Sequence, residues 1–327
     1  MNSPVRAESN SPPGIDAAAP ARNHGRMHLL MLGVTICWAS NIVAGKEALR
    51  GFGALALAQL RLAGAALILG IIFVAWPQRP RIRLQMRQWL FLLWVALFGI
   101  TLNQMFFIGG LSRTSVAHAG LIVALGPVMV LVLSCLMRLE ALTALKFAGM
   151  VISFAGVGFL TMGDSGRGSG ATLGGDLILL AGSAVFAYYT VMMKELAGRY
   201  GALTLNMLIF VMGALMMMPF AGPAILHVRW TLVPSMAWWG LAFMVFFGSA
   251  AAYLIYAFAL TELTAARVAA FAYLQPVIAA ALGVWLLGES VTRREVIGGV
   301  LILLGVYLSE RERGEERQVQ SAAQSLA

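Results

Sequence analysis

The chain has 327 residues, of which 60% are hydrophobic and 11% are charged, and its formal net charge is +9. Soluble domains carry about 25% charged residues, so this composition excludes an ordinary soluble protein and predicts a membrane protein with many spans. The positive charge does not indicate a nucleic-acid partner, because most arginines stand between apolar segments, where basic residues orient a membrane protein.

Both ends of the chain are polar. Residues 1–26 are rich in Pro, Ala, Ser and Asn and predict a disordered cytoplasmic tail rather than a secretory signal. Residues 310–327 predict a second cytoplasmic tail. Between the tails, apolar segments recur with about the 20 residues that a helix needs to cross the hydrocarbon core. The ten predicted transmembrane helices cover residues 28–48, 53–76, 87–109, 115–137, 143–162, 173–194, 203–223, 237–259, 266–287 and 294–309.

An even number of spans places both termini on one side of the membrane. The predicted segments on that side hold clearly more Lys and Arg residues than those on the other side. Because positive charge accumulates on the cytoplasmic side, we expect both termini in the cytoplasm.

The two halves of the chain repeat each other. A shift of 149 residues lays 111-LSRTSVAHAGLIVALGPVMV-130 over 260-LTELTAARVAAFAYLQPVIA-279 without a gap. The predicted domains are therefore a first repeat at 27–162 and a second repeat at 173–309, joined by a glycine-rich linker at 163–172. Each repeat has an odd number of helices, so the second enters the membrane upside down. Inverted repeats are typical of secondary transporters, whose site lies between the halves.

Four features carry a family resemblance: the 38-WASN-41 segment, Arg61 within 57-LAQLRLAG-64, the repeated proline, and the pattern 288-GESVTRREVIGGVLILLGV-306. Over about residues 28–309 the chain resembles an EamA-type member of the drug/metabolite transporter superfamily, near the bacterial amino-acid and metabolite exporters. The resemblance implies an all-α polytopic protein of the bacterial inner membrane, with ten transmembrane helices as two inverted five-helix repeats around a central cavity. It also implies export of small metabolites.

The first helix carries polar residues within an apolar segment. Trp38 is predicted near mid-membrane with Asn41 just outward of it, and a shift of 148 residues lays Ser40 and Asn41 over Tyr188 and Tyr189. We expect Trp38, Asn41, Tyr188 and Tyr189 to line the cavity. The alternative, preferred for Ser40, is hydrogen bonding between helices.

Arg61 is predicted about 12 Å into the second helix, from eight residues at 1.5 Å each. A guanidinium at that depth costs roughly 2.5–3.5 kcal/mol on insertion scales, so it should face protein or water. Two roles stay open: Arg61 holds the carboxylate of a substrate, or it bonds carbonyl groups in a structural role.

Other candidate substrate-binding residues lie in three later helices. Asn103 and Gln104 offer amide groups, and the repeat lays Gln104 over Tyr253. Tyr273 and Gln275 stand beside the second repeated proline. The alternative for Asn103 and Gln104 is hydrogen bonding between helices.

Pro127 and Pro276 are predicted to kink their helices, because proline lacks the N–H that an interior helical turn needs. The kinks would serve as gating elements.

Gly149, Ser153 and Gly156 form a small-residue stripe that Gly298 and Gly305 repeat. Small residues allow close helix approach, so both stripes are expected to be packing faces, with a dimer contact as a further option.

Acidic residues are predicted near helix ends only, which argues against a cationic drug as substrate and leaves His118 as the one candidate proton carrier. His118 itself is expected at a membrane boundary. The two cysteines are interpreted as apolar packing residues.

The sequence therefore predicts a transporter of small zwitterions, amino acids first, working by alternating access. The alternatives are a nucleotide-sugar or organophosphate carrier, a drug transporter, and a passive channel. An enzyme is not expected, because HExxH, GxSxG and P-loop motifs are missing. No metal or cofactor is expected, and the partners are a small-molecule substrate and the lipid bilayer, with a monomer or homodimer.

Overall fold

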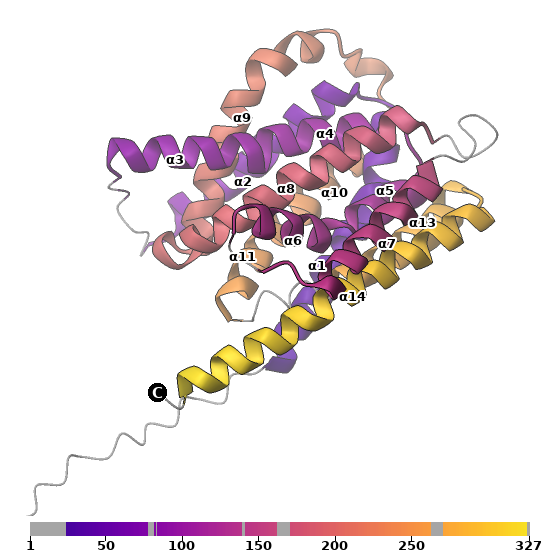
Figure 1. Cartoon of the computed structure of the whole chain (residues 1–327). Coiled ribbons are helices and arrows are strands. Elements are labelled where there is room, and N and C mark those ends of the chain that lie inside the picture. Colours follow the sequence, from indigo (N-terminus) through magenta and orange to yellow (C-terminus); the bar gives the residue numbers. More distant parts are fainter. Residues whose placement is uncertain are drawn as a thin grey trace, which may run out of the picture.

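The computed structural model describes residues 24–77, 82, 84–138, 141–161, 171–262 and 271–325. Every regular element among these residues is helical (Figure 1). The α-helices are α1 (His24–Leu49), α2 (Ala54–Ala75), α3 (Met86–Ala96), α4 (Asn103–Leu111), α5 (Val116–Val123), α6 (Gly126–Leu136), α7 (Ala144–Thr161), α8 (Leu173–Tyr200), α9 (Ala202–Leu226), α10 (Ser235–Val245), α11 (Ala252–Glu262), α13 (Gln275–Leu287) and α14 (Arg293–Ser325). The short elements are the π-helices η1 (Leu97–Leu102) and η3 (Phe246–Ala251) and the 3₁₀ helices η2 (Trp230–Leu232) and η4 (Phe271–Leu274).

Seven helical segments within the described residues are long and apolar enough to cross a membrane. They are Arg26–Leu49, Ala54–Ala75, Met86–Leu111, Val116–Leu136, Leu173–Met193, Ala202–Leu226 and Ser235–Ala259. Two further apolar helices, Ala144–Leu160 and Gln275–Leu287, are shorter.

Both predicted tails differ from expectation where the structure describes them. Residues 1–23 of the first tail lie outside the described residues, but α1 already begins at His24. The second tail was predicted to begin at residue 310, yet α14 continues through the polar sequence as far as Ser325. The predicted linker lies outside the described residues except for its end at 171–172.

Two π-helices interrupt long helices at matching places. The helix from Met86 to Leu111 widens at η1, and the helix from Ser235 to Glu262 widens at η3. The two π-helices are separated by the same shift of 149 residues that aligns the halves of the sequence. Single π-turns inside α-helices are frequent at functional sites, and both lie in the central part of the bundle.

The repeated prolines stand where helices break. α5 ends at Val123, and α6 begins three residues later, at Gly126, with Pro127 in its first turn. Pro276 likewise stands in the first turn of α13, directly after η4. Proline is tolerated there because the N–H groups in the first turn of any helix have no hydrogen-bond partner within the helix.

The small-residue stripes of α7 and α14 face each other within one chain. A Cβ at Gly149 would meet the Gly305 carbonyl oxygen at 2.6 Å, and one at Gly156 would meet the Gly298 carbonyl oxygen at 2.9 Å. Ser153 Oγ donates a hydrogen bond to the Ile302 carbonyl at 3.3 Å. Figure 1 shows α14 lying along α7. The expectation of a packing face is confirmed: each stripe packs against the other within the same chain.

Candidate functional site

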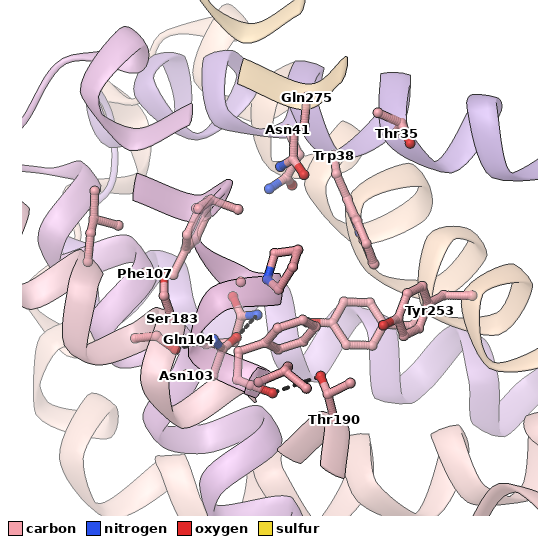
Figure 2. A pocket seen from close by; sticks show the side chains of 18 of the residues that line it. Thr35, Trp38, Asn41, Asn103, Gln104, Phe107, Ser183, Thr190, Tyr253 and Gln275 are labelled. Atoms are coloured by element: carbon pink, nitrogen blue, oxygen red, sulfur yellow. Dashed lines mark hydrogen bonds between the residues drawn. The ribbon is translucent and has the colours of Figure 1, made fainter. Parts of the chain in front are cut away.

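A cavity of about 200 Å³ lies among the central helices (Figure 2). Its walls come from α1, α2, α4, the α5–α6 break, α8, α11 and the η4–α13 junction. The lining residues are Met31, Thr35, Trp38, Asn41, Arg61, Asn103, Gln104, Phe107, Val123, Gly126, Pro127, Val130, Leu179, Gly182, Ser183, Phe186, Thr190, Tyr253, Tyr256, Phe271 and Gln275. Cavities with mostly apolar walls and a few convergent polar groups are typical of small-molecule sites.

Arg61 is bonded to one of the π-helices. Its Nε donates to Ser249 Oγ at 2.7 Å, and its Nη2 donates to the Gly248 carbonyl at 3.1 Å. The side chain is 2% exposed, and its guanidinium carbon lies 5.8 Å from the centre of the Phe107 ring. The third nitrogen, Nη1, has no hydrogen-bond partner among the described residues. Arg61 therefore fills the structural role that the sequence left open and still has one donor to offer.

Two amides beside Arg61 also have unused atoms. Gln104 Nε2 donates to Asn103 Oδ1 at 3.3 Å, and Asn103 Nδ2 donates to the Gly182 carbonyl at 3.2 Å. Gln104 Oε1 and Asn41 Oδ1 are buried and have no donor within the described part of the chain. A buried polar group left unpaired costs about 1–3 kcal/mol. Three such atoms, from α1, α2 and α4, thus belong to residues that line the cavity.

Aromatic rings surround the remaining space. The Trp38 ring centre lies 5.8 Å from that of Tyr253, 5.2 Å from that of Tyr256 and 6.5 Å from that of Phe186. Figure 2 shows Trp38 and Tyr253 pointing into the same space from different helices. These rings offer flat apolar faces, and faces of this kind attract cations as well as apolar groups.

Most of the predicted binding residues meet in this cavity. Trp38, Asn41, Arg61, Asn103, Gln104, Tyr253 and Gln275 line it together with Pro127. Tyr273 is described in its backbone only, so the prediction for its side chain lies outside the described residues.

Tyr188, Tyr189 and Pro276 are not among the lining residues. The hydroxyl of Tyr188 accepts a hydrogen bond from Trp94 Nε1 at 3.0 Å, which turns it toward α3. Tyr189 is buried against Gly99 of η1. Pro276 packs against Gly120 of α5.

The lining face of α8 was missed by sequence reasoning. Gly182, Phe186 and Thr190 follow one another at four-residue spacing and all face the cavity. That spacing is a helical face, so an amphipathic reading of α8 would have found it. Tyr188 and Tyr189 were predicted instead from the repeat alignment. That alignment matches positions along a helix, but it does not show which side of the helix faces the cavity.

Comparison with known proteins gives consistent results. The sequence matches the model of the EamA-like transporter family twice, over residues 25–162 and 173–311. An uncharacterized transporter of Archaeoglobus fulgidus is 30% identical over 87% of this chain and 98% of its own length. The probable terminal-alkyne amino-acid exporter of Streptantibioticus cattleyicolor is 26% identical over 86% of this chain and 93% of its own length. The uncharacterized transporter YyaM of Bacillus subtilis is 26% identical over the same shares.

A solved crystal structure also has this fold. It is 17% identical in sequence and covers 87% of this chain and 96% of its own chain, with a TM-score of 0.59.

Proposed function

Because the chain belongs to the EamA-like transporter family, we propose that it exports small zwitterionic metabolites, amino acids first among them, by alternating access. The chain is a multi-pass membrane protein and a transporter rather than an enzyme. A relative named as an amino-acid exporter supports the substrate class. The bacterial inner membrane, with both termini in the cytoplasm, is the proposed location.

The observation that carries the proposal is the set of unpaired polar atoms on three of the residues that line the cavity. Arg61 Nη1 is a charged donor, and Asn41 Oδ1 and Gln104 Oε1 are neutral acceptors. An amino acid presents the complement at its head group, since its carboxylate accepts and its ammonium donates. The aromatic rings would then surround the side chain.

The proposed architecture is two inverted five-helix repeats. The family matches both halves separately, and the π-helices and broken helices recur at equivalent positions in each half. Discontinuous helices beside a central site are typical of transporters built from inverted repeats. Ten spans and the repeat boundaries at 27–162 and 173–309 follow from this arrangement.

The cavity extends toward one end of the bundle. On α1 the lining residues run from Met31 to Asn41, and on α5–α6 they run from Val123 to Val130. The last turns of α1 and the first turns of α5 contribute none. With the proposed orientation, the cavity faces the cytoplasm and is closed on the outer side.

An organophosphate substrate is less well supported. Arg61 is the one Lys or Arg among the lining residues of the described structure. A phosphate group with its higher charge is usually held by more than one such side chain.

The test is counterflow of labelled amino acids in liposomes that contain the purified protein. We expect saturable exchange in the unmutated protein. The exchange rate should fall at least about tenfold in Arg61→Lys, because a lysine ammonium cannot reproduce the planar array of N–H donors of the guanidinium group. Arg50→Lys is the matched control, since Arg50 is exposed and pairs with Glu47. Absence of exchange for every amino acid would overturn the proposal, and equal exchange in Arg61→Lys would remove Arg61 from the site.

A further inference from the structure

A second cluster of buried polar groups lies outside the cavity. His118 of α5 stands between Asp176 of α8 and Glu295 of α14, and all three residues are at most 5% exposed. His118 Nδ1 lies 2.8 Å from Asp176 Oδ2, and His118 Nε2 lies 3.5 Å from Glu295 Oε1. The cluster joins one helix of the first matched segment to two helices of the second.

Hydrogen bonds hold both carboxylates in place. Thr114 Oγ1 donates to Asp176 Oδ1. The backbone N–H of Thr292 donates to Glu295 Oε2 at 2.6 Å, and the N–H of Glu295 donates to Thr292 Oγ1 at 3.2 Å, which together cap α14. Each carboxylate thus presents its remaining oxygen to the imidazole.

The cluster has room for one more proton than a neutral histidine supplies. When Nδ1–H donates to Asp176, a neutral imidazole turns its Nε2 lone pair toward a carboxylate oxygen of Glu295. Two acceptors then face each other with no hydrogen between them. One proton on either atom converts the contact into a charge-assisted hydrogen bond. Histidine is the side chain that gains a proton near neutral pH.

Other charged groups also lie around α5. From the α13–α14 connection, the Glu289 carboxylate accepts from Val116 N–H at 3.0 Å and from Ala117 N–H at 3.4 Å. Lys46 of α1 lies within electrostatic range of Glu289. The arginines nearest in sequence to His118 and Glu295 have exposed side chains; they are Arg113, Arg293 and Arg294.

We propose that His118, Asp176 and Glu295 form a proton-binding site that latches α5 to α8 and α14, so that loss of the proton releases this end of the bundle. The latch is connected to the cavity through its own helices. α5 leads from His118 to Val123 in the cavity wall, and α8 leads from Asp176 to Leu179. Release would therefore open the end at which the cavity is now closed.

The test measures the distance between spin labels at this end of the protein as a function of pH. Labels on Ser112→Cys and Val291→Cys, both exposed, follow the α4–α5 and α13–α14 connections in a background in which Cys37 and Cys135 are serine. Between about pH 5 and about pH 8, the range over which histidine changes charge, we expect a longer distance to appear as the pH rises. Detection of the distance needs no substrate, so its result is independent of the proposed amino-acid transport.

Glu295→Gln is the decisive variant. A glutamine keeps an oxygen for Thr292 N–H and offers a permanent N–H to His118 Nε2, so it imitates the protonated cluster. We expect the short distance at every pH in this variant, and the unmutated response in the control His227→Gln, since His227 is exposed at the end of α9. A pH-independent distance in the unmutated protein would overturn the proposal, and so would an unchanged pH response in Glu295→Gln.

Discussion

Asn41 presses its side-chain oxygen against Gly248 so closely that a Cβ at that position would overlap it. The equivalent contact occurs in reverse, where the Tyr189 ring lies against Gly99 in the same way. Gly248 lies in η3 and Gly99 lies in η1. Asn41 and Gly99 belong to the first matched segment, and Tyr189 and Gly248 belong to the second. Each half therefore places a side chain against a glycine in the π-helix of the other half.

Gly248→Ala should destabilise the protein by about 1–3 kcal/mol, the usual cost of an added methyl group in a filled site. The new methyl group would displace Asn41 and disturb the Gly248 carbonyl that accepts from Arg61. The measurement is the thermal unfolding temperature in detergent, which should fall. Gly222→Ala in α9 is the control, because a Cβ there meets nothing within 4 Å. Equal unfolding temperatures in the two variants would contradict the contact.

The sequence alone was sufficient to pair these positions but not to show what they do. The repeat aligned Asn41 with Tyr189, and the structure gives the two side chains equivalent contacts. Asn41 lines the cavity, whereas Tyr189 is not among its lining residues. The π-helices were not predicted, because one extra residue in a helical turn has no characteristic composition. Which side of a uniformly apolar helix faces a cavity depends on packing against neighbours that are distant in sequence.

The acidic residues are a second case in which the sequence does not reveal packing between distant segments. Their positions near helix ends were predicted, and Asp176 and Glu295 do lie in the first turns of α8 and α14. Their burial against His118 was not predicted, because it depends on three helix ends meeting at one place. The sequence separation of Asp176 and Glu295 gives no sign of that meeting.

Asn41→Leu should leave the fold intact and lower transport by about tenfold or more. Leucine has the same branching as asparagine, while the unpaired acceptor among the lining residues is lost. Loss of one hydrogen bond to a charged group is worth about 1.5–3 kcal/mol. Counterflow at several substrate concentrations would show the effect mainly as a raised apparent Km. Ser40→Ala is the neighbouring control, since Ser40 is not among the cavity-lining residues. Unchanged counterflow would exclude Asn41 from the binding site.

Gly149→Ala should weaken the packing of α7 against α14. The added Cβ would stand 2.6 Å from the Gly305 carbonyl oxygen and 2.7 Å from the Ser309 nitrogen, and backbone atoms cannot turn aside as a flexible side chain does. We expect a lower unfolding temperature with an unchanged oligomeric state, measured by size-exclusion chromatography with light scattering. Gly158→Ala on the same helix is the control, because a Cβ there has nothing within 4 Å. A change of oligomeric state at unaltered stability would favour an intermolecular role for the stripe.

Glu289→Ala should destabilise the start of α5 by about 0.5–2 kcal/mol, the range measured for lost helix caps. The carboxylate accepts hydrogen bonds from the first N–H groups of α5, and its charge is favourable at the positive end of the helix dipole. Glu289→Gln keeps an acceptor oxygen and loses the charge, so its unfolding temperature should lie between those of the alanine variant and the unmutated protein. Glu47→Gln serves as the control, since Glu47 lies near the end of α1 and pairs with the exposed Arg50. If Glu289→Gln and Glu289→Ala unfold at the same temperature as the control, the contact does not stabilise α5.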